Sequence, residues 1–304
     1  MQERDAAKAS RPGIGIGRLA LIAVAGVVVA WLVATELDRR SRIETIEGVR
    51  PVGAVHLTDG VLVFAERDGR VVSYDIAQRQ ATTLLEGLAR PIAADIGPDG
   101  TACAVDGASQ VGGSAWLTCT SGLHIDLGAF EIPPLGESPR DRAAWLADIV
   151  SDGASGWIVA DRGRTAVLHV ESDGTVAIVV RIRQAVGFAP APLGLARKGN
   201  ALFVALGQGG FSTLTVTERD DEITGGRYVA GHESVALAAT EVWYLPLVLV
   251  RTGDDSGDFV TSPSDSMLAH PRVAERLYRA TGFALLPDGR LAIAANGQLL
   301  LVRP

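Results

Sequence analysis

The feature that most constrains the fold of this chain is a short pattern that recurs six times after residue 50. Each copy has an apolar strand, a tight turn that usually contains Asp-Gly, and a second, more strongly apolar strand. Asp-Gly between two apolar runs is a strong hairpin signal, because the turn requires positive φ. The copies lie at 53–65, 92–105, 146–160, 193–205, 235–246 and 283–295. Repeats spaced by roughly 40–50 residues, with several strands in each, predict the blades of a β-propeller.

Several features of the repeats favour a propeller over a sandwich of two sheets. Strands such as VLVF (61–64) are apolar on both faces, as expected for blade sheets that are buried on both sides. A third strand is expected after most hairpins, at 70–76, 115–120, 166–172 and 298–304. The last repeat lacks a fourth strand, which IETIEGV at 43–49 would supply, closing the ring. We therefore predict an all-β, six-bladed β-propeller over 43–304, preceded by one N-terminal transmembrane α-helix.

The repeats resemble the six-bladed propellers of the NHL and gluconolactonase or strictosidine-synthase-like superfamily. ADRGRTAVLHVESDG at 160–174 is similar to an NHL repeat, and the resemblance covers about 43–304. Lactonases of this superfamily hold a divalent ion on the propeller axis with Glu, Asn and Asp ligands, the acid coming from a Glu-Gly-Pro-like start of the first blade. The stretch here is Glu47-Gly48-Val49-Arg50-Pro51, which leaves Arg50 nearest the acid's position. This departure counts against a metal and against lactone hydrolysis.

One set of polar residues directly follows the second strands of the repeats and should reach one rim of the channel. The candidates for binding at this mouth are Glu66, Asp106, Asp161 and Asn296; Gln208 and Pro246 stand at the corresponding positions of two other repeats. Three carboxylates and an amide around one opening could bind a cation. An acid at such a position could equally cap the adjoining turn. Both interpretations stay open from the sequence.

The two cysteines, Cys103 and Cys119, fall on adjacent strands of the second repeat. If the turn is centred near residues 107–113, they face each other across the pair. Two cysteines in an exported domain favour a disulfide. The alternative is a pair of small buried core residues.

Residues 19–34, LALIAVAGVVVAWLVA, predict a membrane segment. With Thr35 the apolar run is 17 residues long, within the ~17–25 of a transmembrane helix. A cleaved signal peptide is the alternative, but its small-x-small cleavage site fits poorly near Val33, Ala34 and Thr35. We expect a cytoplasmic tail at 1–18, a transmembrane helix at 19–36 and a linker at 37–42. Gly26, Ala30 and Ala34 form a small-residue face on which a partner's helix could pack closely.

The remaining features suggest what this chain does. The net charge of -7 argues against nucleic acid as a partner, because such proteins need a basic surface. No catalytic or metal motif stands out: the serines lack Gly-x-Ser-x-Gly, and the five histidines lack His-x-x-x-His. We therefore expect no cofactor, no metal and no catalytic residue.

The expected protein is a non-enzymatic, single-pass protein of a bacterial inner membrane, with its N-terminus in the cytoplasm and its propeller in the periplasm or outside. It would be an accessory, structural or assembly subunit of a membrane complex, respiratory or photosynthetic, and would contact lipid and integral membrane proteins through helix and propeller. The alternatives are a metal-dependent lactonase-like hydrolase and a sensor of a small ligand.

Overall fold

The computed structural model describes Val28, Trp31 and the residues 42–107, 114–133, 143–182, 191–207, 211–215, 233–238, 247–251, 258–261, 273–277 and 279–303. Val28, Trp31 and Arg42 have helical backbone. The predicted packing face of Gly26, Ala30 and Ala34 lies outside the described residues, as does most of the predicted transmembrane helix. Within the described part, no helix is both long enough and apolar enough to span a membrane. The chain divides into two units, Met1–Ile43 and Glu44–Pro304, and the sheets below belong to the second except for Ile43, the first residue of β1.

The strands of the described residues form six antiparallel sheets. Five of them are built from consecutive segments of the chain, and the sixth joins the last three strands with the first. The first sheet contains β2 (Pro51–Thr58), β3 (Val61–Glu66), β4 (Val71–Asp75) and β5 (Gln80–Leu85). The second contains β6 (Pro91–Ile96), β7 (Ala102–Gly107), β8 (Ala115–Cys119) and β9 (His124–Asp126). The third contains β10 (Leu146–Ser151), β11 (Trp157–Asp161), β12 (Ala166–Val170) and β13 (Val176–Arg181).

The second half of the chain supplies the other three sheets, apart from β1 in the last of them. The fourth contains β14 (Gly194–Lys198), β15 (Ala201–Ala205) and β16 (Phe211–Thr215). The fifth contains β17 (Glu233–Ala238), β18 (Leu247–Arg251), β19 (Asp258–Thr261) and β20 (Val273–Leu277). The sixth contains β21 (Ala280–Leu285), β22 (Leu291–Ala295), β23 (Gln298–Val302) and β1 (Ile43–Ile46). Since β1 pairs with β23, the predicted closing strand is confirmed.

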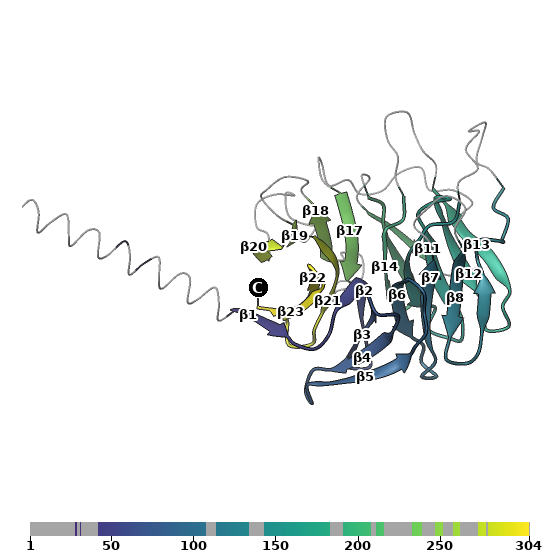
Figure 1. Ribbon diagram of the computed structural model, residues 1–304. Coiled ribbons are helices and arrows are strands. Elements are labelled where there is room, and N and C mark those ends of the chain that lie inside the picture. The colour runs from purple at the N-terminus through teal and green to yellow at the C-terminus, as the bar shows by residue number, and fades with distance from the viewer. Residues whose placement is uncertain are drawn as a thin grey trace, which may run out of the picture. The chain divides into compact units, whose positions relative to one another are not determined.

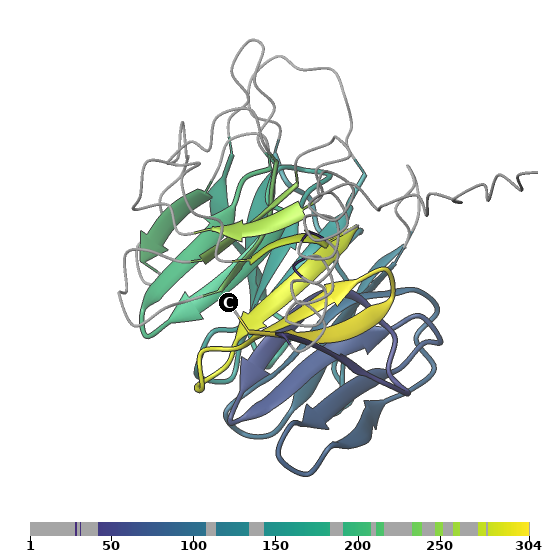
Figure 2. The ribbon, with the colours of Figure 1, turned by 90° about the vertical axis from the view of Figure 1, so that its left-hand side faces the viewer.

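The first strands of the sheets surround a common axis. Each contacts the first strand of the next sheet, from β2 through β6, β10, β14, β17 and β21, and β21 contacts β2 again. Figure 1 shows the succession of sheets, and Figure 2 shows β21–β23, in yellow, beside the blue β2–β5 sheet. The order β2 to β21 and back to β2 closes a ring of sheets, as in a β-propeller.

Burial on both faces of the sheets explains the strongly apolar second strands. In β3, three consecutive side chains, Leu62, Val63 and Phe64, are fully buried although they point alternately to opposite faces. Leu62 and Phe64 pack with Leu299 and Leu301 of the sixth sheet, whereas Val63 packs toward the second sheet. The first sheet is therefore covered by a neighbour on either side, which is why period-2 alternation is missing from β3.

The fifth repeat differs from the prediction. We expected its second strand within 235–246, but the structure places that strand at β18, Leu247–Arg251, and residues 239–246 lie outside the described part. The segment ending at Pro246 was predicted because it continues the apolar hairpin pattern of the other repeats. Proline cannot donate to a sheet ladder, whereas LVLVR offers an uninterrupted apolar strand with every N–H available.

Glycines allow three first strands to approach one another backbone to backbone. A Cβ at Gly53 of β2 would overlap the carbonyl oxygen of Ile92 in β6. A Cβ at Gly282 of β21 would lie 2.6 Å from the Cα of Ala54. The hydroxyl of Thr281 also donates to the Gly53 carbonyl oxygen at 3.2 Å. This close packing fixes the positions of β21, β2 and β6 around the axis.

Candidate functional site

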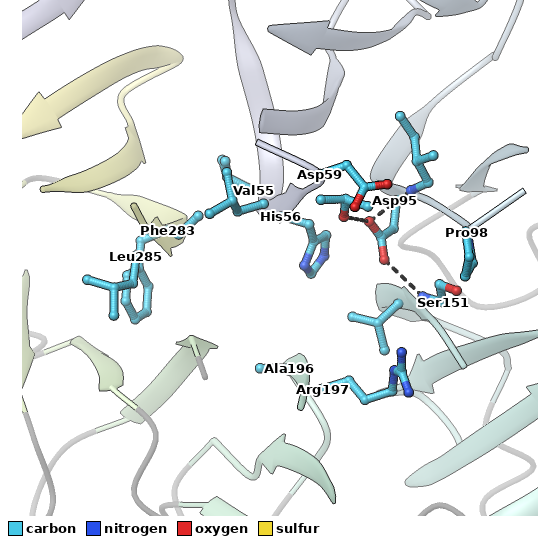
Figure 3. A pocket seen from close by; sticks show the side chains of 15 residues that line it. Val55, His56, Asp59, Asp95, Pro98, Ser151, Ala196, Arg197, Phe283 and Leu285 are labelled. Atoms are coloured by element: carbon cyan, nitrogen blue, oxygen red, sulfur yellow. Dashed lines mark hydrogen bonds between the residues drawn. The ribbon is translucent and has the colours of Figure 1, made fainter. Parts of the chain in front are cut away.

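A cavity of about 420 Å³ lies where the first strands end and turn into the second strands. Small-molecule sites usually have volumes of about 300–1,000 Å³, so this cavity is large enough for a ligand. Figure 3 shows its walls. The lining comes from the ends of five first strands and the turns after them: residues 55–59, 95, 96 and 98, 150 and 151, 196 and 197, and 283–285.

His56 of β2 lines the cavity and is held by Asp148 of β10. Its Nε2 lies 2.9 Å from Asp148 Oδ1, and the side chains are 12% and 2% exposed. Burial by itself would lower the pKa of His56. The charge and hydrogen bond of Asp148, with the charge of Asp95, outweigh it and raise the pKa to about 9. His56 is therefore a cation at neutral pH, paired with a buried carboxylate.

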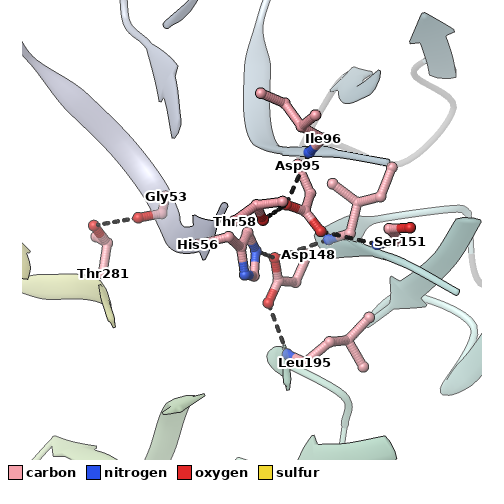
Figure 4. A network of polar contacts seen from close by, with 10 residues as sticks. Gly53, His56, Thr58, Asp95, Ile96, Asp148, Ser151, Leu195 and Thr281 are labelled. Carbon is pink, nitrogen blue, oxygen red and sulfur yellow. Dashed lines mark hydrogen bonds and ion pairs between the residues drawn. The ribbon is translucent and has the colours of Figure 1, made fainter. Parts of the chain in front are cut away.

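The two buried aspartates of this region tie successive sheets together, as Figure 4 shows. Asp95 of β6 accepts hydrogen bonds from Thr58 Oγ1 at 2.9 Å and from the backbone N–H of Ser151 at 2.9 Å. Asp148 accepts from the N–H of Leu195 at 2.7 Å, besides its contact with His56. Each aspartate also accepts from the N–H of its own next residue, at 2.8 Å. Hydrogen bonds to charged groups are strong, so this network holds β2, β6, β10 and β14 in fixed positions at the axis.

Sequence reasoning missed this network. Histidine motifs in a sequence involve residues close together in the chain, whereas His56 and Asp148 are 92 residues apart. A signal was nevertheless present: His56, Asp95 and Asp148 each place an ionisable side chain inside an otherwise apolar first strand. Charged side chains are rarely buried without a partner, so three such positions in successive repeats indicate mutual contacts.

The acids predicted for the channel mouth lie at the other ends of the first strands. Glu66, Asp106 and Asp161 pair with the first residues of β2, β6 and β10, respectively. Each acid is buried and accepts hydrogen bonds from backbone N–H groups just before the strand with which it pairs. Glu66 accepts from residue 50 at 2.6 Å, and Asp106 accepts from residues 89 and 90 at 2.9 and 2.5 Å. Asp161 accepts from residue 145 at 3.1 Å. These contacts match the turn-capping interpretation. Cation binding by these acids stays a prediction.

Arginines complete two of these three capping sites. Arg70 Nη2 lies 2.7 Å from Glu66 Oε2. Arg164 pairs with the fully buried Asp161 and also donates to two backbone carbonyl oxygens in the segment after β9, those of residues 127 and 130. Asn296 is different: it is exposed in the two-residue turn between β22 and β23, where its φ of 53° suits a tight hairpin.

The positions at which a lactonase-like metal site would be expected do not fit one. Glu47 is exposed in the turn between β1 and β2, and the exposed Arg50 offers its backbone N–H to Glu66. Among the described residues, no group of three or more His, Cys, Asp or Glu side chains could hold a metal ion.

The disulfide predicted between Cys103 and Cys119 is present. The two residues are direct partners in the register of β7 and β8, and both are buried. The bond therefore joins neighbouring strands within the second sheet.

Comparisons with known proteins agree with this fold. No protein-family model matches the chain, and no curated protein sequence is significantly similar to it. Among solved structures, a gluconolactonase from Xanthomonas campestris matches with 12% identity and a TM-score of 0.55, over 86% of this chain and 89% of the other. A glucose dehydrogenase matches with 11% identity and a TM-score of 0.56, over 86% and 99% of the two chains. A streptogramin B lyase matches with 12% identity and a TM-score of 0.52, over 86% and 97%.

The chain therefore has a β-propeller fold, as the repeats predicted. At these identities the likeness concerns the fold and does not extend to activity.

Proposed function

We propose that this chain is a non-enzymatic, membrane-anchored β-propeller that acts as an accessory or assembly subunit of a larger membrane complex. The apolar run at 19–35 supports an anchor of adequate length. The Cys103–Cys119 disulfide supports placing the propeller outside the cytoplasm, because disulfides persist in oxidising compartments. In this arrangement the basic N-terminal tail stays in the cytoplasm.

One observation carries the non-enzymatic part of this proposal: the buried acids of the propeller are used by the fold itself. The acids are Glu66, Asp95, Asp106, Asp148 and Asp161, and each accepts hydrogen bonds from backbone or side-chain donors of this chain. A general base needs a carboxylate that can reach and accept a substrate proton. Acids that hold strands and turns in place instead give a rigid body, which suits a protein that works by docking.

The main alternative is a lactonase-like hydrolase, which the fold of the gluconolactonase neighbour suggests. It requires a divalent metal on the axis, and Arg50 stands where the first metal-binding acid would be expected. Metal analysis of the purified protein and an assay with aldonolactones separate the two functions. Stoichiometric bound metal together with lactone hydrolysis would show that the non-enzymatic proposal is wrong.

The accessory role is tested by isolating the full-length protein from its native membrane in mild detergent and identifying the proteins that accompany it. The test variant is Gly26→Ile, which keeps the segment apolar but prevents close helix packing. Its matched control is Val28→Ile, because positions 26 and 28 point to different sides of a helix. We expect both variants to stay in the membrane and only Gly26→Ile to lose partners.

Two other outcomes have defined meanings. If both variants retain the same partners in the same yield, the helix is only a tether and the complex is held through the propeller. If the wild-type protein is isolated without any stoichiometric partner, the accessory role is wrong.

A further inference from the structure

We propose that the axial cavity is a binding site for a small carboxylate with an apolar body. The cavity is lined by the ends of the first strands, whereas the turn-capping acids Glu66, Asp106 and Asp161 lie beside the beginnings of those strands. It is therefore a separate site. The proposal does not depend on the accessory role, since a docking subunit and a free protein could both use this cavity.

The head group of the ligand is set by His56. Its Nε2 is engaged by Asp148, and none of the described residues hydrogen-bonds its Nδ1. In Figure 3 the ring points into the open space between the walls. A protonated imidazole donates from both nitrogens, so Nδ1–H is a charged donor available to a ligand. A carboxylate oxygen is the acceptor that forms the strongest bond with such a donor.

The acids near His56 do not compete for this donor. Asp95 and Asp148 each accept three hydrogen bonds from the surrounding strands. Asp59 belongs to the lining but is exposed to water in the turn after β2. A charge in water is screened far more than one in a cavity. Thr58, Asp95 and Ser151 also line the cavity, but among the described residues none hydrogen-bonds His56 Nδ1, so a ligand oxygen can supply that acceptor.

The body of the ligand is set by the opposite wall. Val55, Phe283 and Leu285 lie together on one side of the cavity in Figure 3, across from Asp95 and Ser151. A ligand that fills this side buries apolar surface, which gains about 25 cal/mol per Å². An aliphatic or aromatic group directly attached to a carboxylate can therefore contact this wall while its head group reaches His56.

A second cation lies at the rim. Arg197 of β14 donates from Nη1 to the carbonyl oxygen of Gly199 at 2.6 Å, and its guanidinium packs against Gly153 of the third sheet. These contacts fix the side chain at the edge of the cavity. Figure 3 places it across the opening from Asp59. Arg197 adds positive potential along the path by which an anion would enter.

The test uses the full-length protein in mild detergent and three probes that share one ring: benzoate, benzyl alcohol and benzylammonium. Binding is measured by isothermal titration calorimetry or by ligand-observed NMR. We expect benzoate to bind at least tenfold more tightly than the other two probes. If benzoate does not bind at millimolar concentration, or if benzylammonium binds more tightly, the proposal is overturned.

Two variants test the position of the ligand. Ala196→Leu fills the cavity without altering the His56–Asp148 pair, and its matched control is Ala81→Leu on the exposed outer strand β5. We expect benzoate binding to be lost in Ala196→Leu and unchanged in Ala81→Leu. His56→Gln removes the charged donor and should weaken benzoate binding at least tenfold.

If His56→Gln does not fold, Ala196→Leu decides alone. Unchanged benzoate binding in a folded Ala196→Leu variant places the ligand elsewhere and refutes the proposal.

Discussion

Raising the pH should remove much of the stability that the His56–Asp148 ion pair gives to the propeller. The pKa of His56 is about 9 in the folded chain, against an ordinary value of 6.5. One pKa unit corresponds to about 1.4 kcal/mol, so a shift of about 2.5 units corresponds to roughly 3 kcal/mol of folding free energy. The acids acting on His56 are Asp148 of β10 and Asp95 of β6.

The sign of this effect follows from the direction of the pKa shift. A folded pKa above the unfolded value means that the folded state binds the proton more tightly. The stabilisation is therefore fully present below about pH 6.5 and is lost as the pH rises through about 9. Above pH 9 the buried Asp148 therefore faces a neutral His56 ring.

Urea unfolding of the full-length protein, followed by tryptophan fluorescence at pH 6, 7, 8, 9 and 10, measures the effect. Other groups titrate near pH 10, so the useful quantity is the difference in free energy of unfolding between the wild type and His56→Gln. We expect this difference to fall by about 3 kcal/mol between pH 6 and pH 10. A difference that stays constant across the series would falsify the assignment of the raised pKa to this ion pair.

Three further substitutions test the structure at other places. Cys103→Ser should lower the free energy of unfolding by about 3 kcal/mol, as expected for a bridge closing a loop of about 15 residues; equal urea midpoints for the variant and the unreduced wild type would contradict the bond. Asp161→Asn should lower the free energy of unfolding by about 3–5 kcal/mol, because it leaves Arg164 as a buried cation without its anion. A thermal midpoint close to that of the wild type would rule out this pairing. Gly53→Ala should destabilise the protein more than Gly60→Ala, because the added Cβ at position 53 meets a backbone carbonyl oxygen. The added Cβ at position 60 has open space and costs about 1 kcal/mol because of the positive φ there. The reverse order of stabilities in chemical denaturation would mean that β2 and β6 are not in contact.

The hairpins and the disulfide could be predicted from the sequence because they depend on residues close together in the chain. Asp59 and Gly60 both have positive φ in the turn between β2 and β3, as an Asp-Gly hairpin requires. Cys103 and Cys119 face each other because one hairpin places them in register. The closing strand followed from the missing fourth strand of the last repeat. The fifth repeat was misplaced because an apolar run alone does not identify which segment joins the sheet.

Sequence by itself thus determined the class of fold, since turn chemistry and apolar strands act over a few residues and recur at a fixed spacing. The candidate site was decided by the tertiary structure alone. His56, Asp95 and Asp148 belong to three different sheets, and Asp95 contacts Ser151 56 residues further along the chain. These side chains meet only when the ring of sheets closes around its axis. Their pairing, their charge and the cavity beside them are therefore properties of that closed ring, which no local pattern encodes.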